Sequence, residues 1–347
     1  MAHTVVLIPG DGIGPEVSDA ARRVLSAAVP DLRWIERDAG QAALDHGADG
    51  LLPESTLEAI RAHRMALKGP CTTPIGGGFS SVNVALRKTL NLYGAIRPIR
   101  SIGGVPTRYE NVDLIVIREN TEGLYSGIEN QITEGVVASL KVATEKACRR
   151  IARFGFEYAV RRGRRKVTVL HKANIMKLSD GLFLRCAREE HVGFEDRVEY
   201  DEQIIDAACM RLVREPHDFD VILCENLYGD VISDLCSGLV GGLGVTPGAN
   251  IGDDCAVFEA VHGTAPDIAG QNLANPLALI MSGVMMLRYI AETRGDAACE
   301  DGADRIRDAY NACLDAGEKT RDLGGTLSTS AFADAIVARL GAPLVRS

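Results

Sequence analysis

Two aspartates stand four residues apart in the segment NLYGDVISDL, at positions 230 and 234. If this segment is a helix, Asp230 and Asp234 share a face, where like charges oppose helix formation unless a cation neutralises them. The helix dipole favours an acid near the N-terminus, which explains Asp230 but explains Asp234 poorly. Asp206 offers a third acid on a separate predicted helix. Because all-oxygen ligation suits hard divalent cations, the spacing favours an Mg²⁺ or Mn²⁺ site.

A second group of residues suits the binding of carboxylates. Ser81 precedes a segment in which Asn83 and Arg87 share a helical face, and Arg97 and Arg118 lie farther along the chain, Arg118 at the end of a strand-like run. The planar guanidinium of arginine presents two parallel donors to a carboxylate. Three arginines at one sheet edge therefore suit a small polycarboxylate, although arginines at the ends of helices and strands are also common surface charges.

Two further side chains could carry protons. Lys172, in HKANIMK, follows a strand-like run, so it is expected where the carboxyl end of a strand opens into a site. A partly desolvated lysine near carboxylates and a metal can accept or donate a proton, whereas a solvated lysine at a strand end needs no function. Tyr125, in EGLYSG, also has two interpretations, a packing role and a catalytic one.

The stretch FEAVHGTAPDIAG (258–270) predicts an irregular loop, because His262, Gly263 and Thr264 precede a proline. Its small residues would let a ligand approach the backbone closely. A carboxylate beside an adenosine ribose accepts hydrogen bonds from the 2′-hydroxyl and repels a 2′-phosphate. If this loop holds a dinucleotide, Asp267 favours NAD over NADP.

The elements that must position these residues alternate between strand-like and helical runs, which predicts a largely parallel sheet covered by helices. IPGDGIGPE (8–16) follows the first strand, but Pro15 stands where the Rossmann fingerprint needs its third glycine. We therefore interpret it as a strand-to-helix turn. Residues 123–142 are expected to form an antiparallel excursion, and 277–290 a buried helix.

Composition restricts the classes of function. The net charge of −9 argues against a general nucleic-acid surface, and the basic run RRGRRK (161–166) is interpreted as a solvated connection. No uncharged run is long enough to span a membrane, and no secretory signal is evident. The nine cysteines form no C-x-x-C pair, which indicates reduced thiols and a cytoplasmic location.

Taken together, six motifs resemble one family over nearly the whole chain: GDGIGPE, GPCTTPIGGGFSSVNVALRK, IRENTEGLYSG, HKANIMK, NLYGDVISDL and GANIGDDCAVFEAVHGTAPDIAG. They are similar, in this order, to the metal-dependent β-decarboxylating dehydrogenases of the isocitrate/isopropylmalate dehydrogenase family. The resemblance implies an α/β fold that is not a Rossmann fold, with two domains around a central cleft. The large domain would combine 1–92 and 241–347, and the small one would hold 93–240 with a dimer clasp at about 123–142.

The resemblance also implies roles for individual residues. Asp230 and Asp234 would hold Mg²⁺ or Mn²⁺ together with Asp206 of the other subunit of a homodimer. Tyr125 and Lys172, the latter also from the other subunit, would transfer protons. The carboxylates of the substrate would bind to Ser81, Asn83, Arg87, Arg97, Arg118 and Asn174.

In this family the dinucleotide binds outside any Rossmann loop. The implied contacts of NAD are Thr72, Glu259, His262, Gly263, Thr264, Ala265, Asp267 and Asn275. NADP-using relatives carry Lys-Tyr where this chain has Asp267 and Ile268, so the resemblance supports NAD as well.

The implied reaction is the oxidative decarboxylation of isocitrate to 2-oxoglutarate and CO₂, with reduction of NAD⁺. The Ser-x-Asn pair formed by Ser81 and Asn83 favours isocitrate over sister substrates. Two alternatives remain at this point: the same chemistry on homoisocitrate or 3-isopropylmalate, and a regulatory subunit of a hetero-oligomer. A regulatory subunit would be expected to lack some of the catalytic residues, and none is missing here.

Overall fold

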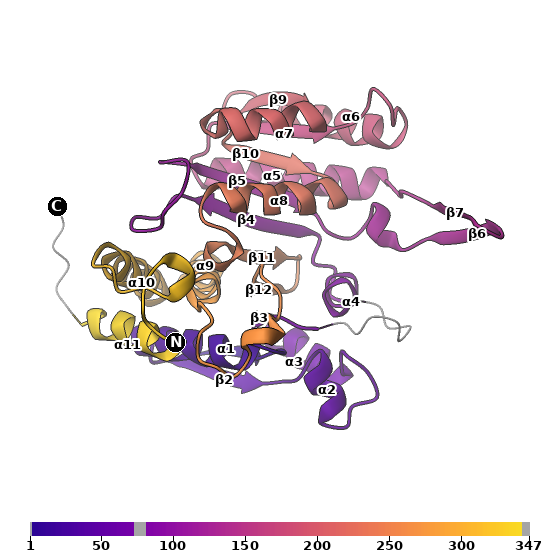
Figure 1. The fold of residues 1–347 in the computed structure, drawn as a ribbon. Helices are drawn as coiled ribbons and strands as arrows, with labels where there is room; N and C mark the ends of the chain where they lie inside the picture. The colour runs from indigo at the N-terminus through magenta and orange to yellow at the C-terminus, as the bar shows by residue number, and fades with distance from the viewer. Residues whose placement is uncertain (1, 73–80, 342–347) are drawn as a thin grey trace.

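The computed structural model describes residues 2–72 and 81–341, so positions 73–80 of the second motif lie outside the described residues. Figure 1 shows two lobes joined by a sheet that passes through both. Its ten strands follow the order β2-β1-β3-β12-β11-β4-β5-β10-β8-β9 within the described chain. Their bounds are β1 (His3–Ile8), β2 (Leu32–Glu36), β3 (Met65–Lys68), β4 (Gly94–Arg100), β5 (Asp113–Glu119), β8 (Lys166–His171), β9 (Glu199–Ile204), β10 (Val221–Cys224), β11 (Pro247–Ile251) and β12 (Ala256–Ala260).

Helices cover this sheet in both lobes (Figure 1). One lobe carries the first and last described elements, β1 and α11, and the other carries the middle of the chain. The helices are α1 (Gly14–Ala28), α2 (Gln41–Asp45), α3 (Glu54–His63), α4 (Val82–Thr89), α5 (Glu145–Arg161), α6 (Ser179–His191), α7 (Ile205–Arg214), α8 (Asn226–Leu239), α9 (Leu277–Arg294), α10 (Ala297–Asp315) and α11 (Thr329–Arg339).

The expectation of a largely parallel sheet holds at both ends of the sheet and fails at its centre. β4 pairs antiparallel with β5 and with β11, and β11 pairs antiparallel with β12. Two of these pairs are joined by connections without a described helix, residues 101–112 between β4 and β5 and residues 252–255 between β11 and β12. Parallel neighbours need a longer crossover, usually one that contains a helix. The single sheet therefore joins the lobes, and the domain limits 1–92, 93–240 and 241–347 stay a prediction.

The GDGIGPE segment forms the strand-to-helix turn expected from its sequence. Gly10 and Gly12 adopt φ of 77° and 61°, and Pro15 lies in the first turn of α1. A Cβ at Gly10 would lie 2.0 Å from the carbonyl oxygen of Pro70, and one at Gly12 would lie 2.1 Å from that of Thr264. Both positions therefore need glycine for the backbone path and for the close approach of other loops.

The apolar run 277–290 forms most of α9, which is buried against α1, α10 and the sheet, as expected. Among the described residues, no helix combines the length and apolar character that crossing a membrane requires. The run 161–166 is the end of α5 and its connection to β8, also as expected.

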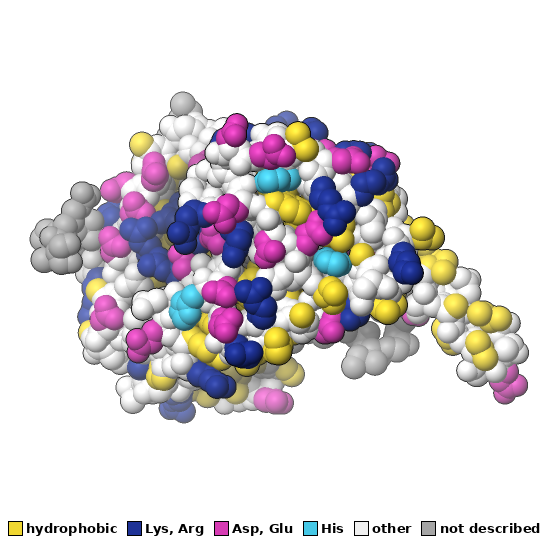
Figure 2. All heavy atoms as spheres, turned by 90° about the horizontal axis from the view of Figure 1, so that it is seen from above, with side chains coloured by type: hydrophobic (Ala, Val, Ile, Leu, Met, Phe, Trp, Pro, Cys, Tyr) yellow, Lys and Arg dark blue, Asp and Glu magenta, His cyan; other side chains and the backbone are white. Residues whose placement is uncertain are grey.

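Residues 123–142 include a separate two-stranded antiparallel hairpin, β6 (Glu129–Thr133) and β7 (Val136–Ser139). This confirms the expected antiparallel excursion. The hairpin projects from the body of the molecule in Figure 1, and Figure 2 shows hydrophobic side chains along the projection. Ile132 is 68% exposed and Val137 is 65% exposed. Apolar side chains so exposed on a projecting element are typical of a surface that another chain covers.

Candidate active site

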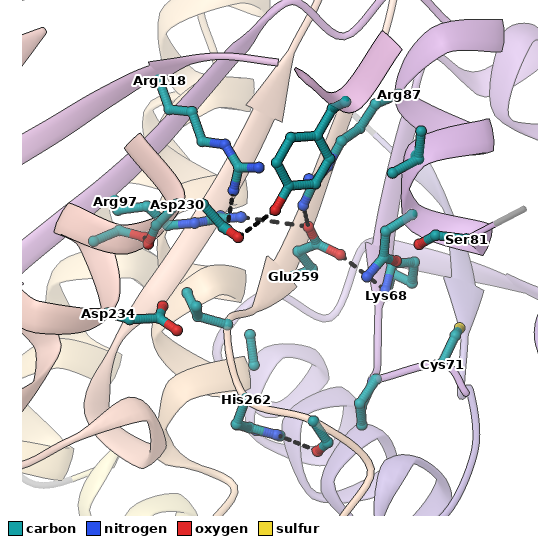
Figure 3. Close-up of a pocket in the computed structure, with 18 residues that line it drawn as sticks. Lys68, Cys71, Ser81, Arg87, Arg97, Arg118, Asp230, Asp234, Glu259 and His262 are labelled. Atoms are coloured by element: carbon teal, nitrogen blue, oxygen red, sulfur yellow. Dashed lines mark hydrogen bonds and ion pairs between the residues drawn. The ribbon is translucent and has the colours of Figure 1, made fainter. Parts of the chain in front are cut away.

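A pocket of about 260 Å³ lies against the central strands β4, β5 and β12, close to α4 and α8 (Figure 3). Its lining is dominated by charged and polar side chains. The residues expected from the sequence that line this pocket are Ser81, Asn83, Arg87, Arg97, Arg118, Tyr125, Asp230, Asp234, Glu259, His262 and Gly263. Residues from distant parts of the chain thus meet in one place.

A buried carboxylate on β12 organises the cations of the pocket. Glu259 is 3% exposed, and its two oxygens lie 2.8 Å from Lys68 Nζ and 3.0 Å from a terminal nitrogen of Arg87. Arg97 approaches to 3.5 Å, and the Asn250 amide donates a hydrogen bond of 2.7 Å. Burial alone would raise the pKa of Glu259, but these positive charges outweigh it and hold the pKa well below its usual range. Glu259 is therefore ionised and pairs with cations.

Two of these arginines keep unused donors. Arg97 NH1 and Arg87 Nε are buried and have no hydrogen-bond partner among the described residues. Burial, opposed in part by Glu259, lowers the pKa of Arg97 to about 10, so the side chain stays charged at neutral pH. Buried donors without partners are costly, and an anionic ligand in the pocket would satisfy them. The pocket is thus suited to a carboxylate-bearing substrate.

Helix α8 supplies the acidic side of the pocket. It begins where the Glu225 carboxylate accepts hydrogen bonds from the backbone N–H groups of residues 227 and 228. Asp230 and Asp234 both line the pocket, which confirms that they share a helix face. The Asp230 carboxylate accepts hydrogen bonds from Arg118 and, at 2.5 Å, from the Tyr125 hydroxyl. Burial and this hydrogen bond raise the pKa of Tyr125, which keeps its proton available.

The carboxylates of α8 fit a divalent cation. Burial, and then repulsion from Asp230, raise the pKa of Asp234. A cation between the two carboxylates would remove the repulsion and favour the ionised forms. Two carboxylates make an incomplete site for Mg²⁺ or Mn²⁺, so further oxygen ligands are needed.

Three of the residues expected to bind the substrate, hold the metal or transfer protons do not reach this pocket within one chain. Lys172 and Asp206 pair with each other at 2.5 Å between Nζ and Oδ1, and neither lines the pocket. Asn174 is exposed in the loop after β8. Their expected contribution to the site therefore requires a second chain.

The expected cofactor residues lie partly around the same opening. His262 Nε2 is buried and has no hydrogen-bond partner among the described residues. A ligand with a hydrogen-bond donor or acceptor would supply that partner. The Thr72 and Thr264 hydroxyls lie 3.2 Å apart. Ala265 has a positive φ of 38°, and Asp267 is exposed in the turn Pro266–Ile268. These features suit a loop that holds a dinucleotide.

Two of the expected cofactor contacts have partners within the chain. Asn275 donates to Asp322 at 2.9 Å and accepts from the backbone N–H of Leu277 at 3.0 Å. Glu259 faces the cation cluster described above. Both side chains are fixed by internal hydrogen bonds, so direct contact with a dinucleotide remains a prediction for them.

Three residues that hold the site together were not expected from the sequence. Lys68 neutralises Glu259 and is the last residue of a buried strand. The sequence could have indicated it, because a charged residue at the end of an apolar run is unusual. Asp11 accepts hydrogen bonds from the backbone N–H groups of Gln41, Ala42 and, at 2.6 Å, Thr72. The GDGIGPE turn thereby fixes Thr72 through a side chain. Asn226 accepts a hydrogen bond from Arg118. Apart from its place in NLYGD, nothing in the sequence indicated this role.

An α/β fold in which buried arginines, an acidic helix face and a loop of small residues surround one pocket is suited to a class of enzymes that bind a small acid. The chain belongs to the isocitrate/isopropylmalate dehydrogenase family, because the family model described as "Isocitrate/isopropylmalate dehydrogenase" matches residues 4–336.

Individual relatives match over almost the whole chain. A Caenorhabditis elegans protein, named as a probable mitochondrial alpha subunit of isocitrate dehydrogenase (NAD), is 49% identical over 97% of this chain and 92% of its own length. A Dictyostelium discoideum protein, named as a mitochondrial regulatory subunit of isocitrate dehydrogenase (NAD), is 49% identical over 97% and 91%. The crystal structure of isocitrate dehydrogenase from Methylococcus capsulatus has a TM-score of 0.91 at 47% identity, covering 97% of this chain and 99% of that chain.

These findings confirm the family, the fold and the class of enzyme expected from the sequence. They contradict the expected cytoplasmic location, because relatives such as the C. elegans protein are named as mitochondrial. That expectation relied on unpaired cysteines, which do not distinguish one reducing compartment from another.

Proposed function

We propose that this chain catalyses the NAD-dependent oxidative decarboxylation of isocitrate to 2-oxoglutarate and CO₂, a reaction of the tricarboxylic acid cycle. The observation that carries the proposal is the set of buried arginines, Arg87, Arg97 and Arg118, around one pocket, two of them with donors that lack a partner among the described residues. A substrate with several carboxylates satisfies such donors. The relatives named as parts of NAD isocitrate dehydrogenases support the choice of isocitrate.

In this proposal the three arginines bind the substrate carboxylates, while Ser81 and Asn83 contact the carboxylate that distinguishes isocitrate from its sister substrates. Asn83 Oδ1 is buried without a partner among the described residues, which leaves it available to a ligand. Asn174 of the partner subunit completes the contacts. Multiple contacts fix the substrate so that the reacting carbon faces the cofactor loop.

Mg²⁺ or Mn²⁺, when bound, acts as a Lewis acid toward the substrate oxygen, and NAD⁺, when bound, accepts the hydride. Asp230 and Asp234 would hold the metal with Asp206 of the partner subunit. The partner subunit's Lys172 accepts the proton of the substrate hydroxyl. The Tyr125 hydroxyl later protonates the carbon that loses CO₂, and its raised pKa keeps that proton in place until it is needed.

NAD is proposed to bind at Thr72 and at the loop that contains His262, Gly263, Thr264 and Ala265, with Asp267 next to the ribose. Glu259 and Asn275 are proposed at its edge. The unpartnered Nε2 of His262 and the positive φ of Ala265 support this assignment. The Asp267 carboxylate would accept a hydrogen bond from the ribose 2′-hydroxyl and repel a 2′-phosphate.

A homodimer with shared sites is proposed as the functional unit, with no nucleic-acid or membrane partner. Lys172 and Asp206 pair away from the pocket, and the β6–β7 hairpin carries exposed apolar side chains. Both features are explained if Lys172 and Asp206 enter the pocket of a second copy of the chain and that copy covers the hairpin. Several relatives are named as subunits, which supports the assembly of more than one chain.

A regulatory subunit remains the second candidate, because one relative carries that name. Against it, the pocket of this chain keeps Tyr125, both α8 aspartates and all three arginines.

The test is the specificity constant of the purified chain for isocitrate, homoisocitrate and 3-isopropylmalate, each with NAD⁺ and with NADP⁺. We expect isocitrate with NAD⁺ to be the best pair. A higher constant for either sister substrate would reassign the substrate, and no turnover of any of them would favour the regulatory subunit.

A further inference from the structure

The side chain of Arg118 is packed against the first turns of α8 at a position that lacks a side chain. A Cβ built at Gly229 would lie 2.5 Å from Arg118 Cγ, 2.6 Å from its Cβ and 3.1 Å from its Cδ. The φ of Gly229 is not positive, so the backbone does not require glycine there. Glycine inside a helix lowers helix stability relative to alanine. The close approach of Arg118 therefore explains the glycine.

Asn226, at the start of the same helix, fixes the orientation of the Arg118 guanidinium. Its Oδ1 accepts hydrogen bonds from Arg118 Nε at 3.0 Å and from a terminal nitrogen at 2.7 Å. Its Nδ2 donates to the carbonyl oxygen of Glu122 at 2.9 Å, in the segment that leads to Tyr125. Asn226 is 1% exposed, so none of these three hydrogen bonds competes with water.

Arg97, on the neighbouring strand β4, is placed in a similar way. A Cβ built at Gly248, on β11, would lie 1.7 Å from Arg97 NH1 and 2.7 Å from Cζ. The guanidinium therefore lies directly over the backbone of Gly248. An alanine at this position would force the unpartnered donor of Arg97 away from its present position.

We propose that Asn226, Gly229 and Gly248 are positioning residues that set the two arginines, Arg118 and Arg97, for the substrate carboxylates. None of the three is proposed to touch the substrate. The inference rests on the proposed function, because it takes these arginines as the substrate-binding groups. Small displacements of groups that bind a reacting molecule are expected to cost about 10²-fold in rate or binding.

The first experiment compares Gly229→Ala with Gly238→Ala, two substitutions in the same helix. A Cβ at Gly238 would meet nothing within 4 Å, so this variant is the matched control. We expect Gly229→Ala to raise the KM for isocitrate by about 10-fold or more and to leave the KM for NAD⁺ unchanged. Gly238→Ala should change neither. A lower melting temperature of Gly229→Ala with an unchanged KM for isocitrate would overturn the proposal, because it indicates a structural role alone.

The second experiment covers the case in which Gly229→Ala does not fold. Asn226→Asp keeps an acceptor for Arg118, whereas Asn226→Leu removes it at similar volume. We expect isocitrate affinity, measured by calorimetry, to fall at least about 10-fold more in Asn226→Leu than in Asn226→Asp. Equal losses in the two variants would contradict the role of the acceptor.

Gly248→Ala tests Arg97 by the same KM measurement, with the same expected direction. Arg118→Ala separates this proposal from the function on which it rests. If Arg118→Ala raises the KM for isocitrate and the positioning variants do not, the positioning role is wrong and the substrate site stands. If Arg118→Ala itself leaves the KM unchanged, the assignment of the substrate site is wrong.

Discussion

At the scale of single residues, the pocket depends on one buried anion, Glu259, and the cations around it. Lys68 is 1% exposed and lies 2.8 Å from the Glu259 carboxylate. From the sequence, Glu259 was expected among the cofactor contacts and Lys68 was passed over, because a linear sequence does not show which charges meet across a sheet. β3 and β12 pair in parallel, with Lys68 opposite Glu259, and only this register reveals the ion pair.

Replacing Lys68 with methionine should destabilise the protein, because it removes one partner of a buried ion pair. We expect the free energy of unfolding in urea to fall by about 3 kcal/mol. Lys146→Met, on the exposed face of α5, is the control and should change it by less than about 0.5 kcal/mol. An equal effect of the two substitutions would show that the buried pair adds nothing.

The ionised state of Glu259 predicts a dependence of stability on pH. Its folded pKa is below the unfolded value of 4.5, because the attraction of Lys68, Arg87 and Arg97 exceeds the effect of burial. The resulting stabilisation is present above about pH 4.5 and is lost as the pH falls below it. The difference in unfolding free energy between the native protein and Glu259→Gln should therefore narrow by about 1.4 kcal/mol per pH unit below pH 4.5. A difference that stays constant between about pH 6 and pH 3.5 would contradict this ionisation.

Cofactor choice is also decided at this scale. Asp267→Lys with Ile268→Tyr should lower the ratio of NAD⁺ to NADP⁺ specificity constants by at least about 10-fold, because a positive charge attracts the 2′-phosphate. Asp267→Asn, which removes the negative charge alone, should produce a smaller change in the same direction. An unchanged ratio in the double variant would exclude this loop from the ribose site.

At the scale of elements, the sequence predicted the parts of the fold whose signals are local. The helical spacing of Asp230 and Asp234, the turn before Pro15 and the buried helix at 277–290 were all expected and are present. The antiparallel centre of the sheet was not expected, because strand direction depends on which strands meet. The same reason explains why Asn226 was missed: its partner, Arg118, is on β5, far from α8 in the chain.

The β6–β7 hairpin gives the prediction that belongs to this scale. Ile132→Asp with Val137→Asp should convert the proposed dimer to a monomer, because burying two carboxylates in an interface is costly. Sedimentation or light scattering would measure the change, and NADH production should fall with it. Glu134→Gln, at the tip of the hairpin, is the control. A dimer that persists in the double variant would remove the hairpin from the interface.

At the scale of the whole molecule, the pocket of one chain contains the two α8 carboxylates, Asp230 and Asp234, but neither Lys172 nor Asp206. Lys172 and Asp206 pair with each other in the lobe that carries the middle of the chain, and their role in a shared site is a prediction about a second copy. The resemblance to the family predicts a site shared between two chains, and the absence of both residues from the lining of the pocket supports that prediction.

A shared site predicts complementation. Lys172→Met and Asp230→Asn homodimers should each be inactive. When they are mixed after reversible dissociation, half of the dimers are hybrids with one intact site, so about a quarter of the native rate should return. Mixing Lys172→Met with itself is the control. If both residues served the same chain's site, no activity would return.

The most direct measurement is the initial rate at which NADH absorbance increases when isocitrate, NAD⁺ and Mg²⁺ are added to this chain as the only polypeptide. We predict a rate that depends on isocitrate, disappears with EDTA and is much lower with NADP⁺. A stable dimer that gives no NADH, although isocitrate binds in calorimetry, would contradict the proposed catalytic role and would indicate a regulatory subunit.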